Sequence, residues 1–299
     1  MAFYLGIDGG GTKTKFLLGN EQQILAEATT AGSNILRSPS GEASVREALH
    51  AGVREICGAA GLDASLIVHT VAGIAGSSHQ TMRASLMAIL QEVLTGDIEV
   101  IGDMEIAHYA ALEGGPGILV NAGTGSIAYG RNAQGETARS GGWGFTISDE
   151  GSGYWIGRVA LASAMRRYDA DRGDPFLHHL IAALGVNGPQ NLAMIPVSRS
   201  LSDVFPIVVS IAELGDETAR EILKRAGEEL ADLGVTVVAR LFDESEAVSV
   251  AASGGVFRSS SIVFESFSKT LAAERAKAQI SLSNADPAMG ALMLARQHA

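Results

Sequence analysis

The chain has 299 residues, 46% of them apolar, and a formal net charge of −11. This length can bury a large core and favours two domains over one. The acidic balance argues against nucleic acid or an anionic membrane surface as a partner. It does not exclude a phosphate ligand, because a local site can hold phosphate by backbone N–H groups.

Cysteine occurs once in the sequence, at Cys57, on the apolar stripe of a predicted helix. A disulfide within the chain and a cysteine-rich metal site are therefore excluded. The first residues, MAFYLGIDGG, show no basic region and no long apolar core, so no signal peptide is predicted. No apolar run reaches the length of a membrane span. We therefore expect a cytoplasmic protein.

The first part of the chain predicts alternating strands and helices. Apolar runs predict strands at 3–7 and 13–19, joined as a hairpin by a glycine-rich turn. Apolar residues at helical spacing, from Val45 to Cys57, predict a helix over 41–60. Further elements are expected as strands at 24–30, within 66–76 and from 97 to about 103, and as helices at 79–94 and after Asp103.

The turn residues EGGPG at 113–117 predict a domain junction. Two strands joined by a tight turn are expected within 117–136, and a glycine-dense loop follows at 141–157. The remaining elements are expected as helices at 156–168 and 216–242, a strand, glycine turn and helix within 247–260, a strand from 278, and a closing helix from Pro287.

This alternation predicts an α/β class. Gly11-Thr12 and Gly123-Thr124 each open a hairpin after an apolar strand, which indicates two lobes built on one plan. We expect a first lobe of residues 1–115, completed by 287–299, and a second lobe of residues 116–286.

The two glycine turns are candidate phosphate sites. Glycine lets backbone N–H groups converge on an anion, since no Cβ atom blocks the approach. Hydroxyl groups of Thr12, Thr14, Thr124 and Ser126 are expected to add donors, and Lys13 a positive charge. Asp8, at the mouth of the first turn, is expected to attract Mg²⁺ through water, because Mg²⁺ keeps most of its hydration. This is not the strand–loop–helix phosphate motif, because each turn leads into a strand.

Three segments, GIDGGGTKTKFLLG, NAGTGSIAYG and VAASGGVF, resemble the phosphate and adenosine motifs of the actin-like ATPase superfamily. With GGWGFTISDEGSGYWIG, the chain closely resembles the BadF/BadG/BcrA/BcrD ATPase family, in its N-acetylglucosamine and glucosamine kinase branch. The resemblance runs from Gly6 to the closing helix, with little signal between about 169 and 214. It implies a two-lobed, duplicated ribonuclease H-like fold that binds ATP in the cleft between its lobes.

The resemblance also assigns roles to residues. It implies that ATP is bound by both glycine turns and the adenosine motif, and the sugar by residues of both lobes. The implied ATP contacts are Gly10, Gly11, Thr12, Lys13, Thr124, Gly125, Ser126, Gly254 and Gly255, and the implied sugar contacts are Asn34, Asp103, Gly142, Trp143 and Asp149. Ser148 stands where the family usually has glycine, which leaves the identity of the sugar open.

Several of these residues also have a structural interpretation. Asp103 at a strand end is able to cap the following helix, and Asn34 alone is typical of a turn. Trp143 is able to belong to a core, although a tryptophan between glycines is more typical of a pocket. Asp149 and Glu150 are able to form a solvated acidic pair.

The preferred hypothesis is an ATP- and Mg²⁺-dependent kinase that phosphorylates the 6-hydroxyl of N-acetyl-D-glucosamine, with Asp103 orienting or accepting the hydroxyl proton. Glucosamine is the alternative substrate. An activator ATPase for a dehydratase would need cysteine ligands for an iron–sulfur cluster, and a non-catalytic sugar sensor would lack the base. A homodimer is expected.

Overall fold

The computed structural model describes residues 2–34, 41–170 and 173–297. Contacts between its residues divide the chain into two compact units. Unit 1 comprises residues 1–115 and 285–299, and unit 2 comprises residues 116–284. The chain therefore crosses between the units twice, first beside the predicted junction EGGPG and again just before the last helix.

Unit 1 is built on a five-stranded sheet in the order β3-β2-β1-β4-β5. β1 pairs antiparallel with β2 and parallel with β4, so the predicted hairpin is confirmed. The strands are β1 (Phe3–Gly9), β2 (Lys13–Gly19), β3 (Ile24–Ala31), β4 (Ile67–Ile74) and β5 (Asp97–Ile101).

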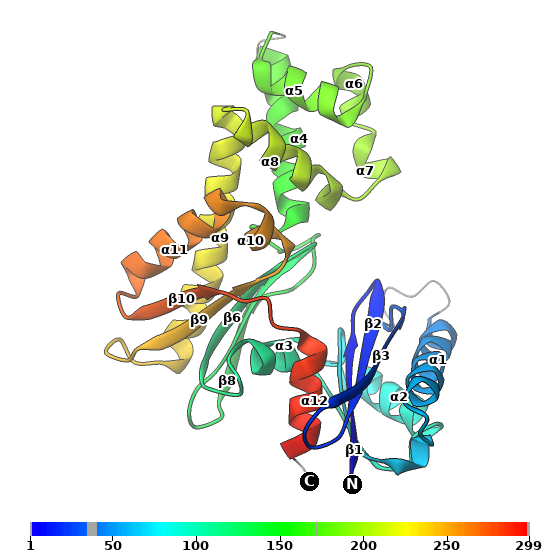
Figure 1. The fold of residues 1–299 in the computed structure, drawn as a ribbon. Coiled ribbons are helices and arrows are strands. Elements are labelled where there is room, and N and C mark those ends of the chain that lie inside the picture. The colour runs from blue at the N-terminus through cyan, green and yellow to red at the C-terminus, as the bar shows by residue number, and fades with distance from the viewer. Residues whose placement is uncertain (1, 35–40, 171–172, 298–299) are drawn as a thin grey trace. The chain divides into compact units, whose positions relative to one another are not determined.

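Helices cover both faces of this sheet because its strands alternate apolar side chains between two cores. Leu5 and Ile7 face the core formed with α1 (Glu42–Ala60) and α2 (Gln80–Gln91). Tyr4 belongs to the other core, with α3 (Asp103–Ala111) and α12 (Pro287–Gln297). The closing helix thus completes the unit that contains the N-terminal strand (Figure 1). A short 3₁₀ helix, η2 (Ala64–Leu66), precedes β4.

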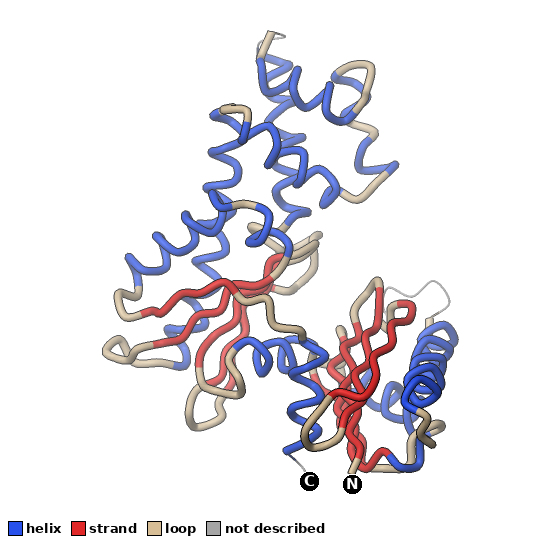
Figure 2. The backbone as a smooth tube through the Cα atoms, viewed as in Figure 1, coloured by secondary structure: helices blue, strands red, loops and turns tan. Residues whose placement is uncertain are grey.

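Unit 2 repeats the same plan. Its five-stranded sheet has the order β10-β9-β6-β7-β8. Listed from the other edge, this order corresponds strand by strand to that of unit 1, with β6 in the place of β1. The central strand β6 pairs antiparallel with β7 and parallel with β9, as β1 does with β2 and β4. Figure 2 shows the two sheets. The strands are β6 (Gly117–Ala122), β7 (Ser126–Arg131), β8 (Thr137–Gly141), β9 (Val248–Ser253) and β10 (Ala278–Leu282).

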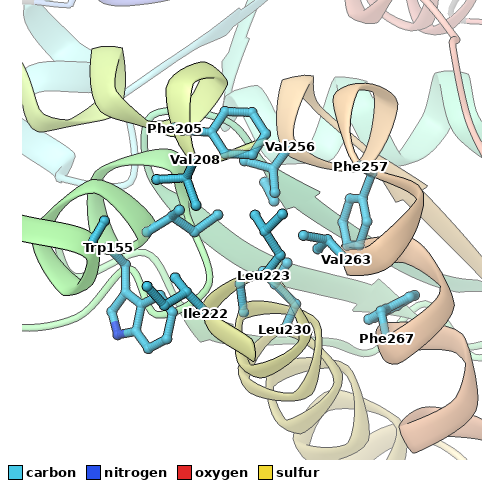
Figure 3. Close-up of a cluster of buried hydrophobic side chains, with 14 of the residues drawn as sticks. Trp155, Phe205, Val208, Ile222, Leu223, Leu230, Val256, Phe257, Val263 and Phe267 are labelled. Atoms are coloured by element: carbon cyan, nitrogen blue, oxygen red, sulfur yellow. The ribbon is translucent and has the colours of Figure 1, made fainter. Parts of the chain in front are cut away.

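The helices of unit 2 build its large core. Side chains of α4, α8, α9, α10 and α11 gather in one buried cluster, in which Leu223 and Leu230 come from the long helix α9 (Figure 3). The helices are α4 (Gly153–Ala170), α5 (Pro175–Leu184), α6 (Pro189–Leu192), α7 (Ile195–Ser198), η3 (Leu201–Val204), α8 (Phe205–Glu213), α9 (Glu217–Leu241), α10 (Gly255–Ser259) and α11 (Ser261–Glu274).

The α/β class and the duplicated plan are confirmed by these two sheets. Two parts of unit 2 were not predicted. β8 is a five-residue strand, TARSG, whose polar composition gives no strand signal. The helices between Pro175 and Glu213 lie where the sequence showed little pattern. Among the described helices, none is by itself long and apolar enough to cross a membrane, and one bent pair, Pro175–Leu184 with Pro189–Ser198, meets the criterion by length and composition only.

The closing helix lies unusually close to β1, at Gly6. A Cβ atom added there would lie 2.6 Å from the carbonyl oxygen of Ala288 and in conflict with the backbone N of Leu292. Both atoms belong to the backbone of α12, so they cannot move aside as a flexible side chain can. Glycine at this position therefore sets the distance between the central strand and the last helix.

We predict that Gly6→Ala lowers the free energy of unfolding by about 1–3 kcal/mol, the usual cost of overpacking. The control is Gly58→Ala, on the exposed side of α1, where an added Cβ has no neighbour within 4 Å. This variant should gain roughly 0.5–1 kcal/mol, because alanine favours a helix over glycine. Chemical denaturation of both variants measures the difference, and equal effects would contradict the close approach of α12.

Candidate functional site

The turn between β1 and β2 is held in a tight form that exposes its tip. The Gly10 N–H donates to the Lys13 carbonyl at 3.0 Å, while Gly11, Thr12 and Lys13 are exposed. Thr14 behaves differently from expectation: it is buried, and its hydroxyl donates to the Ala31 carbonyl at 2.8 Å. Its hydroxyl therefore joins β2 to β3, and Thr12 is the exposed threonine of the turn.

Asn34 is joined to the same turn through its neighbour. The Ser33 N–H donates to the Gly10 carbonyl at 3.1 Å, and Ser33 is fully buried. Asn34, which follows, is half-buried at the end of the segment after β3. The structure thus brings the predicted sugar-binding asparagine and the first phosphate turn together within unit 1.

A group of carboxylates lies beside this turn in unit 1. Asp8 is near the end of β1, Asp103 is the first residue of α3, and Asp286 directly precedes α12. Burial, followed by the charges of Asp103 and Asp286, raises the pKa of the Asp8 carboxyl to about 6, against the opposing charges of Lys13 and Lys15. The three carboxylates therefore form one electrostatic cluster.

Asp103 is not the N-cap residue of its helix. Gly102 is the capping residue of α3, and its N–H donates to the Glu105 carboxylate at 2.9 Å. Burial raises the pKa of the Asp103 carboxyl, the backbone N–H groups of Met104 and Asp103 oppose this shift, and the charge of Glu105 adds to it. A half-buried carboxylate whose pKa is raised is a suitable proton acceptor for a hydroxyl group.

Lys15 is the cation that forms an ion pair with Asp286 of this cluster. It lies opposite Asp8 in the β1–β2 register, and its Nζ contacts Asp286 at 2.8 Å and Glu27 at 3.4 Å. The hydrogen bond from Lys15 to Asp286 raises the pKa of the lysine despite its partial burial. Sequence reasoning missed Lys15 and Asp286, whose contact spans 271 positions. The one sequence signal for this contact was the position of Asp286 directly before the closing helix.

The described residues include no group of three or more His, Cys, Asp or Glu side chains with metal-binding geometry. Asp8 is nevertheless surrounded by acidic charge, since Asp103 and Asp286 both raise its pKa. A hydrated divalent cation fits such a place, because Mg²⁺ usually keeps several waters and takes one or two carboxylates. The residues present thus fit Mg²⁺ held through water by Asp8.

The corresponding turn in unit 2 joins β6 to β7. The Gly123 N–H donates to the Gly125 carbonyl at 2.9 Å, and Thr124 is exposed at the tip, as Thr12 is in unit 1. Ser126 differs from expectation, because it is buried and its hydroxyl donates to the Glu150 carbonyl at 2.6 Å. The hydroxyl of Ser126 therefore holds the neighbouring loop and is already engaged.

The loop between β8 and α4 wraps around this turn. The Gly142 N–H donates to the Ser126 carbonyl at 2.9 Å, and the Gly153 N–H donates to the Gly123 carbonyl at 2.9 Å. Asp149 is buried with a left-handed φ of 69°, and its carboxylate accepts from the Ser126 N–H at 3.4 Å. The predicted sugar loop and the second phosphate turn are thus one structural assembly.

Two glycines of this assembly lie in close contact with their neighbours. A Cβ atom on Gly125 would lie 2.8 Å from the Asp149 carboxylate. A Cβ atom on Gly254, whose φ is 102°, would collide with the backbone of Ala122 at the end of β6. The turn that ends at Gly254 therefore lies against β6, the strand that leads into the second phosphate turn, and Gly255 follows it as the first residue of α10.

Trp143 presents its ring at the surface of unit 2. Its side chain is 62% exposed, and the guanidinium carbon of Arg139 lies 4.2 Å from the ring centre. Phe145, further along the loop, packs on Tyr154 with ring centres 4.6 Å apart. Trp143 is therefore not a core residue, and an exposed indole is a suitable platform for a sugar ring.

We predict that Asp8→Asn stabilises the protein at neutral pH when neither Mg²⁺ nor nucleotide is present. Because folding raises the pKa of Asp8 to about 6, the folded state binds more protons than the unfolded state between pH 4 and 6. The carboxylate therefore costs stability that increases as pH rises through this range. Asn removes this cost, about 1–3 kcal/mol at 1.36 kcal/mol per pKa unit.

Thermal unfolding of both proteins at pH 4 and pH 7.5 measures this effect. The stability gained by Asp8→Asn should be near zero at pH 4 and largest at pH 7.5. A loss of stability that is the same at both pH values would contradict the electrostatic cluster.

Comparison with known proteins identifies the family. The family model described as the BadF/BadG/BcrA/BcrD ATPase family matches residues 5–295. An N-acetylmuramic acid/N-acetylglucosamine kinase of Clostridium acetobutylicum is 32% identical over 305 residues, covering 99% of both chains. An N-acetyl-D-glucosamine kinase of Dictyostelium discoideum is 28% identical, covering 98% of this chain and 97% of its own.

The structural comparison agrees. The crystal structure of a putative N-acetylglucosamine kinase from Chromobacterium violaceum has a TM-score of 0.78 and 25% sequence identity, covering 98% of this chain and 99% of that chain. Each of the two units has one five-stranded sheet of the same plan. Solved sugar kinases of the actin-like ATPase fold match this chain over nearly its full length. The chain belongs to the BadF/BadG/BcrA/BcrD ATPase family and has an actin-like ATPase fold.

Proposed function

We propose that this protein transfers the γ-phosphoryl group of ATP to the 6-hydroxyl of an amino sugar, N-acetyl-D-glucosamine. The observation that carries the proposal is Asp103, a half-buried carboxylate whose pKa is raised by burial and which is not the N-cap residue of its helix. The two relatives that cover nearly the whole chain are N-acetylglucosamine kinases by name, which supports the same substrate.

The residues divide the work between the two units. Thr12 with its turn in unit 1, and Thr124 with its turn in unit 2, each offer exposed backbone N–H groups and a hydroxyl to phosphate oxygens. Mg²⁺, when bound through Asp8, neutralises charge on the phosphates. Asp103 orients the sugar hydroxyl and accepts its proton, while Asn34, Gly142, Trp143 and Asp149 hold the sugar.

N-acetylglucosamine is favoured over glucosamine because both relatives are named as kinases of the N-acetylated sugar. A free ammonium group would need a carboxylate partner, and Glu150 is the candidate in the loop. Its carboxylate accepts a hydrogen bond from the Ser148 hydroxyl at 3.1 Å, and its carbonyl accepts from Ser126. Ser148, which replaces the usual glycine, thus contacts this carboxylate, which is still able to accept further hydrogen bonds.

An activator ATPase is not favoured, because Cys57 is buried in α1 and burial raises the pKa of its thiol. That position offers no thiolate for an iron–sulfur cluster. A homodimer and a cytoplasmic location are further proposals, consistent with a sugar-phosphorylating enzyme.

Asp103→Asn should lower kcat for N-acetylglucosamine phosphorylation by about 10²–10⁴, the usual contribution of a general base. The affinity for ATP should stay within about twofold, because Asp103 contacts the sugar hydroxyl and not the nucleotide. Steady-state kinetics and equilibrium binding of ATP measure the two effects separately.

The matched control is Asp97→Asn, which removes an exposed carboxylate from the opposite end of β5. Its kcat should equal that of the wild type. Near-normal turnover by the Asp103→Asn variant would remove Asp103 from the mechanism, and a wild type that releases ADP without a sugar phosphate would refute the kinase.

Trp143→Ala should raise KM for N-acetylglucosamine at least about tenfold, equivalent to one contact of 1.4 kcal/mol, while KM for ATP stays unchanged. KM for the sugar should rise because the indole is proposed to hold the sugar. The fold should be unaffected because the indole lies at the surface and supports no core. Ile147→Ala in the same loop removes a side chain that is 80% exposed and controls for disturbance of the loop. Equal changes in both KM values for Trp143→Ala would show that the loop serves the nucleotide.

A further inference from the structure

The segment that follows β3 lies directly against the first phosphate turn, the turn between β1 and β2. We call residues 32–34 the sugar segment, because Asn34 at its end is the proposed sugar ligand. The Ser33 N–H donates to the Gly10 carbonyl at 3.1 Å, so one backbone hydrogen bond joins the sugar segment to the turn. Both belong to unit 1.

Gly32 packs closely against the backbone of the turn. A Cβ atom added there would lie 2.6 Å from the Gly11 carbonyl carbon and 2.9 Å from the Thr12 backbone nitrogen. These atoms belong to the backbone, so they cannot rotate aside as the end of a side chain can. The Thr12 N–H is one of the groups proposed to meet phosphate, and Gly32 of the sugar segment is therefore in contact with a phosphate-binding group.

Ser33 makes a second contact, with the end of β1. Its hydroxyl oxygen occupies the place that a Cβ atom on Gly9 would take, beside the Ile74 side chain, whose Cγ1 would lie 2.9 Å from that atom. Ser33 is fully buried, and within the described residues its hydroxyl has no hydrogen-bond partner. The side chain of Ser33 therefore joins the sugar segment to β1 by packing.

Close approach alone makes Gly9 and Gly32 sensitive to a larger residue. Neither belongs to the glycines with a positive φ, so an alanine is able to adopt the backbone conformation of each. The conflict of an added methyl group lies entirely with the neighbouring segment. The phosphate turn and the sugar segment therefore cannot shift independently of one another.

We propose, on the basis of the proposed function, that Gly32 and Ser33 are positioning residues that couple the sugar ligand of unit 1 to its phosphate turn. A sugar held by Asn34 fixes the sugar segment and, with it, the backbone N–H of Thr12. Phosphate held by the turn fixes Asn34 in return. A first ligand that orders both segments lowers the entropic cost of binding the second. Each substrate thus tightens the binding of the other, by the same factor.

The test measures the binding of each substrate alone and in the presence of the other. The probes are N-acetylglucosamine and a non-hydrolysable ATP analogue with Mg²⁺, and isothermal titration calorimetry gives the dissociation constants. The ratio of the dissociation constants of the analogue without and with saturating sugar is the coupling factor. In the wild type it should be at least about fivefold, the lower end of the usual range.

Gly32→Ala should weaken binding of the analogue, measured without sugar, at least about tenfold. The substitution lies in the sugar segment, but its Cβ atom displaces the Thr12 backbone. Gly9→Ala should weaken binding of the sugar, measured without nucleotide, at least about fivefold, because its Cβ atom displaces Ser33 and with it Asn34. Adding Ser33→Gly to Gly9→Ala removes the conflicting hydroxyl and should restore part of the lost sugar affinity.

Ser33→Ala is a milder variant that keeps the backbone hydrogen bond to Gly10. It removes a hydroxyl that has no partner within the described residues, so thermal unfolding should show that the fold is kept. It opens a gap next to Gly9, and the coupling factor should fall at least about threefold. The matched control is Ser268→Ala in α11 of unit 2, where the serine hydroxyl is also buried without a partner in the described part of the chain. Its coupling factor should equal that of the wild type.

Gly96→Ala is the matched control for the two glycine substitutions. Gly96 lies in unit 1 directly before β5, and its added Cβ atom would lie 2.6 Å from the Val68 carbonyl oxygen, at the opposite end of the sheet from Gly9. Like Gly9 and Gly32, it has no positive φ. This variant creates the same kind of backbone conflict and should lower stability, while both dissociation constants stay unchanged.

The outcomes separate this inference from the proposed function. If Gly32→Ala weakens only sugar binding and Gly9→Ala only nucleotide binding, the two sites are independent and the coupling is overturned. Equal losses of affinity in Gly96→Ala, or an unchanged coupling factor in Ser33→Ala, overturn it as well. A wild type that shows the coupling but forms no sugar phosphate supports this inference and refutes the kinase. A wild type that binds no sugar overturns both.

Discussion

The structure depends on one backbone constraint, which occurs once in each unit. The central strand must end in a glycine turn that leads back into an antiparallel strand and exposes a threonine at its tip. In unit 1 this turn follows β1 and carries Thr12, and in unit 2 it follows β6 and carries Thr124. Each turn is tied to other segments, through Ser33 in the first case and through the loop before α4 in the second.

Because each turn is tied to other segments, glycine residues near it lie in close contact with neighbouring segments. A Cβ atom on Gly125 would press on the Asp149 carboxylate, and a Cβ atom on Gly254 would collide with the backbone at the end of β6. Gly6 has the same role on the central strand of unit 1, where α12 approaches the backbone. Glycine is thus used here for proximity as much as for flexibility.

The carboxylates of unit 1 lower the stability of the folded protein, because they are partly buried and lie close to one another. Asp8 and Asp103 are partly buried, and burial is the largest cause of the raised pKa of each. The Lys15–Asp286 ion pair places a cation beside Asp8 and joins the start of α12 to β2. The folded protein therefore maintains an unfavourable group of negative charges that a divalent cation is able to neutralise.

Much of this architecture could be predicted from the sequence. The β1–β2 hairpin, α1, α9 and the closing helix follow from apolar periodicity and from glycine and proline at defined places. The equivalent order of the two sheets confirms the expectation of two lobes on one plan, which rested on the repeated Gly-Thr pair.

Other features could not be predicted because they depend on tertiary packing. β8 has a polar, glycine-containing sequence and becomes a strand through pairing with β7. The hydroxyl groups of Thr14 and Ser126 resemble ligand donors in the sequence, but the fold uses both internally. The pairing of Lys15 with Asp286, and the position of Arg139 over Trp143, join residues whose proximity no local pattern reveals.

The central claim is that ATP is consumed in order to phosphorylate an amino sugar. The most direct measurement incubates the wild-type protein with ATP and Mg²⁺, with and without N-acetylglucosamine, and quantifies ADP together with the sugar phosphate. Nuclear magnetic resonance of the product locates the phosphate on the sugar. The account predicts one molecule of N-acetylglucosamine 6-phosphate for each ADP and very slow ADP formation without sugar, because the sugar hydroxyl is the proposed acceptor of the phosphoryl group. ADP formation at the same rate with and without sugar, without any sugar phosphate, would contradict it.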